Sequence, residues 1–276
     1  MRNRKLAIFV STLLKSRYKV SIKGGELLKS EKSSLYLPNH QAEVDPQILL
    51  AEIGKWDDAV PMISETYYNL PLVKSFMKVL GAVPVADMEA GSRDITVLDK
   101  MRAGMLAALR DGKSILLYPA GQLCMQGYEK VGNKQSAYKL TKELDDDIRI
   151  IGVRQHGLWG SIWSRAWWGK SPSFFKVFLF SIFYVLANFI FFVPKRTVEI
   201  EFVDLTEEAK KKAHNATRQE FNKYLEDFYN ESGEEELRFI KHFFYVPKLN
   251  FKPPKRIKGK INKTGDLKFG DLPKQD

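Results

Sequence analysis

The chain contains, at residues 34–53, the stretch SLYLPNHQAEVDPQILLAEI. Its first four residues, Ser34–Leu37, have the composition of a short strand, and the pattern over residues 46–53 is typical of a helix. Proline directly after an aspartate, as at Asp45-Pro46, is a common way for a helix to begin. A strand followed at once by a helix indicates a unit of an α/β fold.

The same alternation continues on both sides of this stretch. Further short β-rich runs predict strands at residues 18–22, 82–85, 114–118, 148–153 and 198–203. Helical spacing of apolar residues predicts helices at residues 95–109, 134–143 and 206–229. We therefore expect the α/β class, with a single sheet covered by helices on both faces.

The 276 residues suit one large domain with appendages. We expect three consecutive parts: an amphipathic helix at residues 1–17, a domain at residues 18–247 and a disordered tail at residues 248–276. The net charge of +11 belongs to the two ends, because residues 1–23 hold seven cations and no acid, and the tail holds nine cations against three acids. The body between them is slightly acidic. A membrane surface or a nucleic acid could bind the ends, but a basic groove through the body is not expected.

Two segments have the composition of membrane-binding helices. Residues 6–14 are largely apolar between cationic flanks, which favours an amphipathic helix on a membrane, with a helix packed on the core as the alternative. Residues 177–193 carry no charge. At about 1.5 Å per residue they span roughly 25 Å, less than the ~30 Å hydrocarbon core. Because a predicted strand follows and must rejoin the sheet, we expect residues 173–193 to be an interfacial helix that dips into one leaflet or docks on the body.

The single cysteine, Cys124, excludes an internal disulfide and a zinc site of several cysteines. We therefore expect a cytoplasmic protein, or one on the cytoplasmic face of a membrane as a peripheral or monotopic protein.

The turn after the strand at residues 34–37 places His40 and Asp45 five positions apart. Histidine suits proton removal near neutral pH, because its ordinary pKa is about 6.5, and it needs a partner that fixes its tautomer. Asp45 can accept a hydrogen bond from one ring nitrogen while the other faces a substrate hydroxyl. This is the His-Asp half of a catalytic triad. Asp45 as a helix N-cap and His40 as an ordinary loop residue remain open alternatives.

Four stretches, in this order, resemble the motifs of the glycerolipid acyltransferases, which include the 1-acyl-glycerol-3-phosphate and lysophospholipid acyltransferases. They are Asn39-His40 with Asp45, GAVPV at residues 81–85 followed by Arg93, LLYPAGQ at residues 116–122, and IIGVR at residues 150–154. The resemblance covers about residues 18–245. GLWGS at residues 157–161, with Ser164-Arg165 behind it, is most similar to acyltransferase modules of bacterial proteins fused to acyl-carrier-protein ligases.

The resemblance implies transfer of a fatty acyl group from acyl-CoA or acyl-carrier protein to the free hydroxyl of a lysophospholipid or lysophosphatidate. His40 is then the general base and Asp45 the carboxylate that orients it. Esterification from a thioester requires neither a metal nor a cofactor beyond the acyl donor. The residues expected to bind substrate are Asn39, Arg93, Pro119, Gly121, Gln122 and Arg154.

The phosphate of such an acceptor calls for cationic donors, and Arg93 and Arg154 are the candidates because each lies beside a motif. Arg93 could equally be a solvent-exposed residue of a first helical turn. The third motif departs from the family, because Ala120 stands where most members have glutamate. Gly121 still allows a backbone approach to a phosphate, although an ordinary turn explains it equally well.

Two other function classes compete with the enzyme. A catalytically degenerate acyltransferase fold that binds lipid or acts as a scaffold at the membrane is motivated by Ala120. A nucleic-acid-binding protein is disfavoured by the acidic body and the absence of a binding motif, so no nucleic acid is expected as a partner. Four tryptophans could line an acyl tunnel, lie at a membrane interface or pack in the core: Trp159, Trp163, Trp167 and Trp168.

Overall fold

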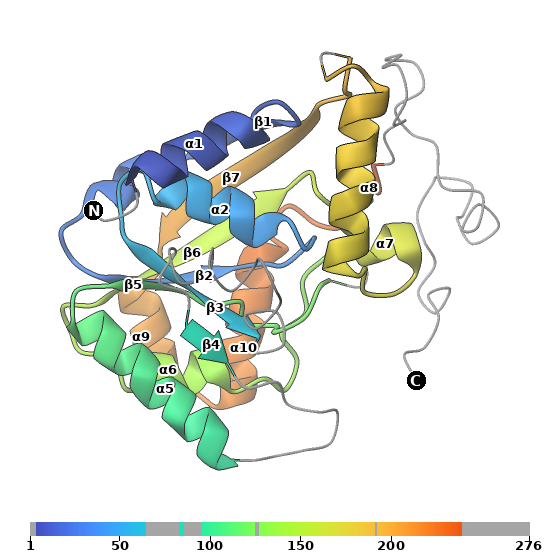
Figure 1. The fold of residues 1–276 in the computed structure, drawn as a ribbon. Coiled ribbons are helices and arrows are strands. Elements are labelled where there is room, and N and C mark those ends of the chain that lie inside the picture. The colour runs from blue at the N-terminus through green and yellow to red at the C-terminus, as the bar shows by residue number, and fades with distance from the viewer. Residues whose placement is uncertain (1–3, 65–82, 86–94, 125–126, 191, 239–276) are drawn as a thin grey trace.

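The computed structural model describes residues 4–64, 83–85, 95–124, 127–190 and 192–238 (Figure 1). Its strands are β1 Tyr18–Lys23, β2 Ser34–Pro38, β3 Ala59–Ser64, β4 Val83–Val85, β5 Ser114–Leu116, β6 Arg149–His156 and β7 Arg196–Asp204. Its helices are α1 Arg4–Leu14, α2 Asp45–Ile53, α5 Ile95–Arg110, α6 Ser136–Lys142, α7 Arg165–Trp168, α8 Phe174–Ala187, α9 Thr206–Asn215 and α10 Arg218–Tyr229, with a 3₁₀ turn at Gly25–Lys29. The predicted tail at residues 248–276 lies outside the described residues.

The seven strands form one sheet in the order β1-β7-β6-β2-β5-β3-β4. All neighbouring pairs are parallel except β6 and β7, which are antiparallel. β2 lies between β5 and β6, so the motif that follows β2 leaves from the middle of the sheet. The prediction of a single α/β sheet is confirmed, although β3 was not anticipated from the sequence.

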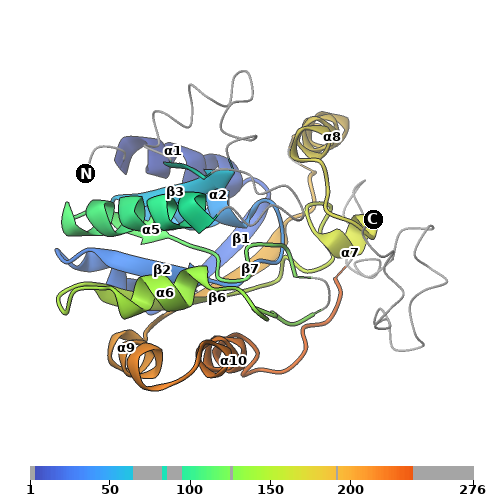
Figure 2. The same ribbon diagram turned by 90° about the horizontal axis from the view of Figure 1, so that it is seen from below.

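Alternate residues of β2 enter two separate cores. Leu35 and Leu37 pack with α5, α6, α9 and α10, whereas Tyr36 packs on the other face of the sheet with residues of α2 and α8. This follows from the period of two along a strand. Figure 2 shows α9 and α10 on one side of the sheet and α1 and α2 on the other. Helices therefore cover both faces, as predicted.

α1 rests on α2 through a narrow contact. Its buried residues are Ala7 and Ser11, and the Ser11 hydroxyl donates a 2.7 Å hydrogen bond to Glu52 of α2. Ile8, Phe9 and Leu13 remain exposed. α1 thus packs on the body with one face and leaves a second apolar face uncovered by the described residues, so its binding to a membrane stays a prediction.

α8 ends at Ala187 and does not continue to residue 193 as predicted. Phe189 and Ile190 adopt positive φ angles of 50° and 65°, a left-handed conformation that an α-helix does not accept. Only Val177 and Tyr184 of α8 are buried. Among the residues that the structure describes, no helix combines the length and apolar character needed to cross a membrane.

The prediction of one continuous helix at residues 206–229 is wrong. The backbone is extended at Ala216, and α10 begins after Thr217 with a capping box, in which the Thr217 hydroxyl accepts from Glu220 N–H and the Glu220 carboxylate accepts from Thr217 N–H. The sequence Thr217-x-x-Glu220 is the pattern of a capping box, and a prediction based on apolar spacing alone does not detect it. The break lets α9 and α10 pack side by side on the sheet.

Replacing Thr217 by alanine removes the hydroxyl that accepts the Glu220 amide hydrogen. An N-cap of this kind typically contributes about 1 kcal/mol, so we expect the free energy of unfolding, measured by urea denaturation, to fall by about that amount. Thr217→Ser keeps a hydroxyl and is the matched control. Equal stability of the alanine and serine variants would contradict the role given to the cap.

Candidate active site

The loops that carry the predicted motifs leave the same edge of the sheet. β2, β5 and β6 are parallel neighbours, so their carboxyl ends at Pro38, Leu116 and His156 lie together. The N–H of Cys124, in the loop after β5, donates a 2.7 Å hydrogen bond to the carbonyl oxygen of His40, in the loop after β2. Ligands of parallel α/β sheets bind at this edge, which makes it the candidate site.

His40 and Asp45 form the predicted contact. The distance between His40 Nδ1 and Asp45 Oδ2 is 3.2 Å. The same carboxylate oxygen accepts hydrogen bonds from the backbone N–H groups of Gln41 at 2.6 Å and Ala42 at 3.0 Å. One buried oxygen therefore holds both the imidazole and the turn that carries it.

Asp45 does not cap α2 with its side chain. Val44 occupies the N-cap position without a side-chain hydrogen bond, and Asp45 is the first residue of the helix. Its carboxylate turns back to the preceding loop instead of accepting from the helix N–H groups. The helix fixes the backbone of Asp45, and the side chain is left to serve His40.

The His40 ring packs against Tyr118, with 4.2 Å between ring centroids and an angle of 34°. The His40 side chain is 15% exposed, and among the described residues none forms a hydrogen bond with its Nε2. Because an imidazole that donates from Nδ1 to a carboxylate carries its lone pair on Nε2, this nitrogen is the one able to accept a proton from a ligand.

The surroundings of His40 make it a stronger base than a free imidazole. Burial acts to lower the pKa of His40, but the hydrogen bond and the negative charge of Asp45 outweigh it, so the pKa lies above the ordinary 6.5. Burial raises the pKa of Asp45, and the contact with His40 counteracts this rise. An imidazolium formed on His40 would be stabilised by the adjacent carboxylate.

Glu129 is a part of the site that sequence reasoning missed. Its carboxylate accepts the backbone N–H of His40 at 2.5 Å, and its own backbone is held by Asn230, which exchanges hydrogen bonds of 2.8 and 2.9 Å with it. Burial raises the pKa of Glu129 to about 7, against the opposing effect of the His40 N–H. No motif marks Glu129 in the sequence, because its partner lies 89 positions away.

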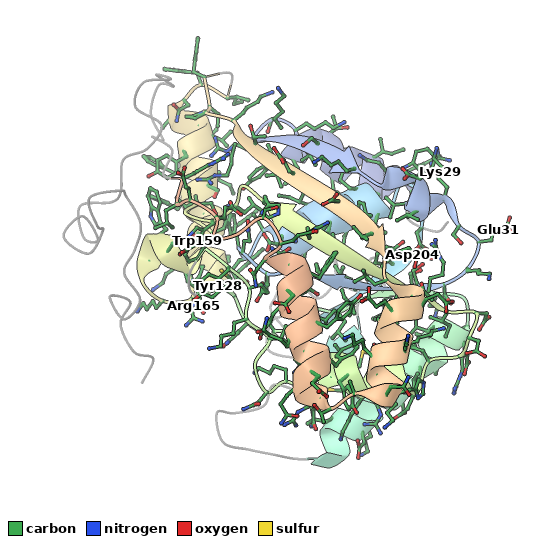
Figure 3. The ribbon with its side chains drawn as sticks, turned by 180° about the vertical axis from the view of Figure 1, so that it is seen from behind. Lys29, Glu31, Tyr128, Trp159, Arg165 and Asp204 are labelled. Carbon is green, nitrogen blue, oxygen red and sulfur yellow. The ribbon has the colours of Figure 1, made fainter. Side chains whose placement is uncertain are left out.

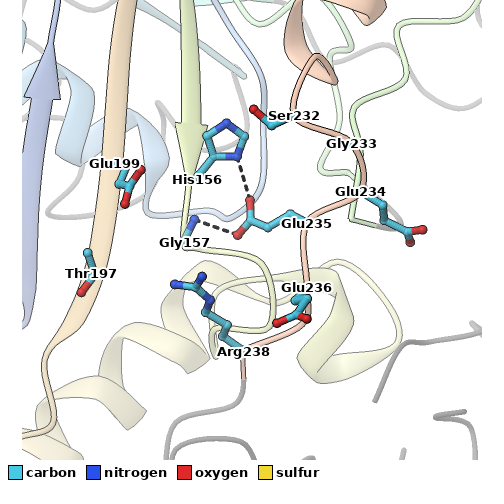
Figure 4. A pocket seen from close by; sticks show the side chains of 10 residues that line it. All are labelled: His156, Gly157, Thr197, Glu199, Ser232, Gly233, Glu234, Glu235, Glu236 and Arg238. Carbon is cyan, nitrogen blue, oxygen red and sulfur yellow. Dashed lines mark hydrogen bonds and ion pairs between the residues drawn. The ribbon is translucent and has the colours of Figure 1, made fainter. Parts of the chain in front are cut away.

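A second histidine-carboxylate pair lies behind the first motif. Glu235 accepts from His156 Nδ1 at 3.1 Å and from Gly157 N–H at 2.7 Å (Figure 4). It also accepts from Gln41 Nε2 at 2.5 Å. Gln41 also accepts the N–H of Leu158 at 3.0 Å. A cleft of about 300 Å³ borders this network and is lined by His156 and Glu235, but not by His40 or Asp45. Gln41 thus anchors the His40 loop to the segment that follows α10.

Asn39 joins the end of β2 to β6. Its side-chain amide donates to the carbonyl oxygen of Gln155 at 2.9 Å, and its side-chain oxygen accepts the Gln155 N–H at 2.7 Å. Both functional groups of this buried side chain are occupied. The structure therefore gives Asn39 a role in positioning the loop that carries His40, and its contact with substrate stays a prediction.

The third motif forms a tight turn after β5. Pro119 and Ala120 are buried, whereas Gly121 and Gln122 are exposed. Gly121 has a φ of +61°, which favours glycine, and its N–H donates to the carbonyl oxygen of Tyr118 at 3.1 Å. The amide expected to meet a phosphate is thus engaged within the turn, and the open alternative, an ordinary turn, describes Gly121.

Arg154 is committed to two carboxylates. It forms ion pairs with Glu201, at 3.0 Å, and with Glu231, and its guanidinium lies over the ring of Phe228. These partners place it on the face of the sheet covered by α10. In this structure Arg154 thus has two carboxylate partners, and its contact with a phosphate stays a prediction. The second predicted cation, Arg93, lies outside the described residues.

The tryptophans divide into core and boundary residues. Trp159 and Trp163 are buried, at 1% and 7% exposure, whereas Trp167 and Trp168 are half-buried. Figure 3 shows Trp159 at the end of the sheet where the motif loops lie, opposite to Asp204. For Trp159 and Trp163 the structure supports packing in the core, the plainest of the three alternatives.

The replacement Asp45→Asn tests the electrostatic interaction between His40 and Asp45. It removes the charge that raises the pKa of His40 and leaves the burial that lowers it, so we expect the pKa of His40 to fall below that of the wild type. The measurement is an NMR titration of the imidazole C–H signals, with exposed His214 of α9 as the internal reference. An unchanged His40 titration would refute the pairing of the two side chains.

Comparisons with known proteins agree with this geometry. Residues 19–154 match the sequence model of a protein family described as Acyltransferase. No curated protein matches the chain at a significant level. A solved structure with a similar fold is the 1-acyl-sn-glycerophosphate (LPA) acyltransferase PlsC from Thermotoga maritima, with a TM-score of 0.50 and 18% identity over 83% of this chain and 76% of that chain. The matched segment contains the His40–Asp45 pair and the carboxyl ends of β2 and β5, so the part of the chain that holds the candidate site is similar to the acyltransferase family.

Proposed function

We propose that this acyltransferase moves a fatty acyl group from an acyl thioester to the free hydroxyl of a lysophospholipid, with His40 as general base oriented by Asp45. The observation that carries the proposal is the pair itself. Nδ1 faces a buried carboxylate at 3.2 Å, and Nε2 has no hydrogen-bond partner among the described residues. An imidazole held in this tautomer is suited to remove a proton from a bound alcohol.

In the proposed reaction His40 Nε2 takes the proton of the acceptor hydroxyl while the oxygen attacks the thioester carbonyl carbon. The imidazolium is stabilised by Asp45, and the intermediate collapses by breaking the C–S bond. The departing thiolate then takes the proton from Nε2, which restores neutral His40 and leaves an ester and a free thiol. Every atom is accounted for without a metal or a redox cofactor, and without an acylated enzyme.

The proposed acyl acceptor and acyl donor are inferred from similarity to known acyltransferases. The four motifs resemble those of glycerolipid acyltransferases, and PlsC, whose fold is similar, is a 1-acyl-sn-glycerophosphate acyltransferase. This makes lysophosphatidate the first acceptor to test. Both acyl-CoA and acyl-carrier protein deliver the same thioester, and the similarity of residues 157–165 to modules fused to carrier-protein ligases supports including the carrier protein.

Replacing His40 by alanine removes the proposed base. We expect acyl transfer to fall by about 10²- to 10⁴-fold, the usual contribution of a general base, while the chain remains folded. The measurement is the initial rate with palmitoyl-CoA or palmitoyl-carrier protein and 1-acyl-glycerol-3-phosphate, with folding checked by circular dichroism.

His214→Ala is the matched control, because His214 is an exposed residue of α9 on the far side of the sheet. It should leave the rate unchanged. Transfer that persists in His40→Ala at the rate of the control would reject His40 as the base. A wild-type chain that binds lysophospholipid without transferring an acyl group would instead support the scaffold alternative that Ala120 suggested.

We also propose that the enzyme binds the membrane that holds its substrate through an apolar ridge on α8 and the segment after it. The ridge consists of side chains that are 43–68% exposed: Phe175, Phe178, Leu179, Ile182, Phe183, Leu186, Phe189, Ile190 and Phe192. A contiguous apolar surface of this kind marks an interaction site on a soluble domain. Aromatic residues favour the interface between lipid and water.

The charge around the ridge fits an anionic lipid surface. The sequence has no acidic residue from position 148 to position 198, and exposed Lys170, Lys176 and Lys195 flank the ridge. Each cation close to an anionic leaflet contributes about 1 kcal/mol. On α1, exposed Phe9 and Leu13 offer a second apolar contact.

Reversing the three flanking charges, with Lys170→Glu, Lys176→Glu and Lys195→Glu in one variant, should weaken binding to vesicles of phosphatidylglycerol and phosphatidylcholine by at least about 10-fold, because about 1 kcal/mol is lost per cation. Binding of the wild type should also weaken with added salt. Vesicle co-sedimentation measures both effects.

The matched control reverses three exposed lysines near the other helix layer, Lys113→Glu, Lys134→Glu and Lys211→Glu, and changes the net charge equally. An equal loss in both variants would mean that only net charge matters. Phe178→Ser with Phe183→Ser tests the ridge itself, and binding that resists this change would reject the ridge as the contact.

A further inference from the structure

Arg165, at the start of α7, is a buried cation that has no counter-ion among the described residues. It is 2% exposed, and no carboxylate of these residues lies within ion-pair distance. Its guanidinium forms one hydrogen bond within the described part of the chain, from Nη1 to the carbonyl oxygen of Leu123, which is long at 3.5 Å, and Nε has no partner there. A guanidinium presents five N–H donors, so most of its capacity is unused among these residues.

Arg165 lies beside the loops that form the candidate active site. Leu123 belongs to the loop after β5, and the next residue, Cys124, donates its N–H to the carbonyl oxygen of His40. On the other side, the carbonyl oxygen of Trp163 accepts the N–H of Glu43. Figure 3 shows Arg165 near Trp159 at the same end of the molecule. The loop that accepts the Arg165 hydrogen bond and the residues just before Arg165 therefore both contact the loop that contains His40 and Asp45.

Half-buried Arg154 and buried Arg196 show how the same charge is satisfied elsewhere. Arg154 pairs with two carboxylates, and Arg196 donates to the carbonyl oxygens of Gly157, Trp159 and Arg238. Burial lowers the pKa of both Arg165 and Arg196. A buried charge is unfavourable unless it is paired and hydrogen-bonded, so Arg165 lacks the compensation that these two have.

We propose that Arg165 binds a phosphate group of the substrate in the active site formed by His40. A phosphate supplies the negative charge and the acceptor oxygens that Arg165 lacks, and a guanidinium grips it through two parallel hydrogen bonds. The inference rests on the proposed function, because it assigns part of the substrate to this residue. It also replaces Arg154, which the structure commits to other partners. The phosphate belongs either to the lysophospholipid acceptor or to the acyl-CoA donor.

The test compares substrates that differ only in their phosphate. Rates with 1-acyl-glycerol-3-phosphate and with the corresponding monoacylglycerol give the preference for an acceptor phosphate. Rates with palmitoyl-CoA and with the palmitoyl thioester of N-acetylcysteamine give the preference for donor phosphates. In Arg165→Gln we expect one of these two ratios of kcat/KM to fall by about 10- to 100-fold, the usual effect of a charge-assisted contact. The ratio that falls identifies which phosphate is bound.

Two further variants keep the result decisive. Arg165→Lys retains the positive charge but not the planar guanidinium that can form two parallel hydrogen bonds, so it should keep part of the preference for the substrate with phosphate. It replaces Arg165→Gln if the glutamine variant does not fold. Arg110→Gln breaks an exposed ion pair with Asp145 and should leave both ratios unchanged. Loss of activity that is equal for substrates with and without phosphate, or two unchanged ratios in Arg165→Gln, would overturn the proposal.

A binding measurement separates this proposal from the proposed function. If the wild type transfers no acyl group to any of these acceptors, thermal unfolding with glycerol 3-phosphate and, separately, with coenzyme A decides the matter. A rise in Tm with either ligand for the wild type and for Arg110→Gln that is absent in Arg165→Gln supports the phosphate site. No rise in the wild type with either ligand, or an equal rise in all three proteins, rejects it.

Discussion

The carboxylate of Asp45 is the contact on which the geometry of the site depends. One of its oxygens accepts hydrogen bonds from His40, Gln41 and Ala42, and the side chain is fully buried. Removing a carboxylate from water is costly unless it is hydrogen-bonded, and these donors compensate for it. Asp45 is the first residue of α2, whose apolar side chains pack in the core. The packing of a helix therefore sets the position of a single polar atom.

The raised pKa of His40 follows from that arrangement. Asp45 raises the pKa of the imidazole, and Glu129, held by Asn230, approaches the backbone of the same residue. A neutral, tautomerically defined imidazole next to a buried carboxylate suits proton removal from an alcohol. The position between two acidic groups also favours the charged form that the base adopts after it has taken the proton.

The surface that we assign to the membrane belongs to a segment inserted between two neighbouring strands of the sheet, and its helix α8 packs on the same face as α2. Parallel β2, β5 and β6 deliver three loops to one edge, whereas the antiparallel strand β7 returns the chain after α8. Residues 157–195 therefore leave and rejoin the sheet at neighbouring strands, and they contain both Arg165 and the apolar ridge. An insertion at this place can contact the catalytic loops at one end and expose apolar side chains along α8.

Much of the site was readable from local sequence. The strand, the turn and the helix at residues 34–53 are close to those observed, and the His40–Asp45 contact follows from five positions across a tight turn. The break between α9 and α10 was also encoded locally, in Thr217 and Glu220, but apolar periodicity does not detect a capping box. The single helix predicted at residues 206–229 was wrong because it relied on apolar periodicity, which continues across the capping box.

The sequence by itself determined the α/β class, the main elements and the candidate base with its carboxylate, because these depend on residues close together in the chain. Tertiary structure alone decided the partners of polar side chains that lie far from their partners in the chain. Arg154 contacts two glutamates, Glu129 contacts the backbone of His40, and Arg165 is buried with no carboxylate partner among the residues that the structure describes. Which charges meet depends on strand order and on the packing of distant loops, and a pair separated by dozens of residues leaves no local pattern.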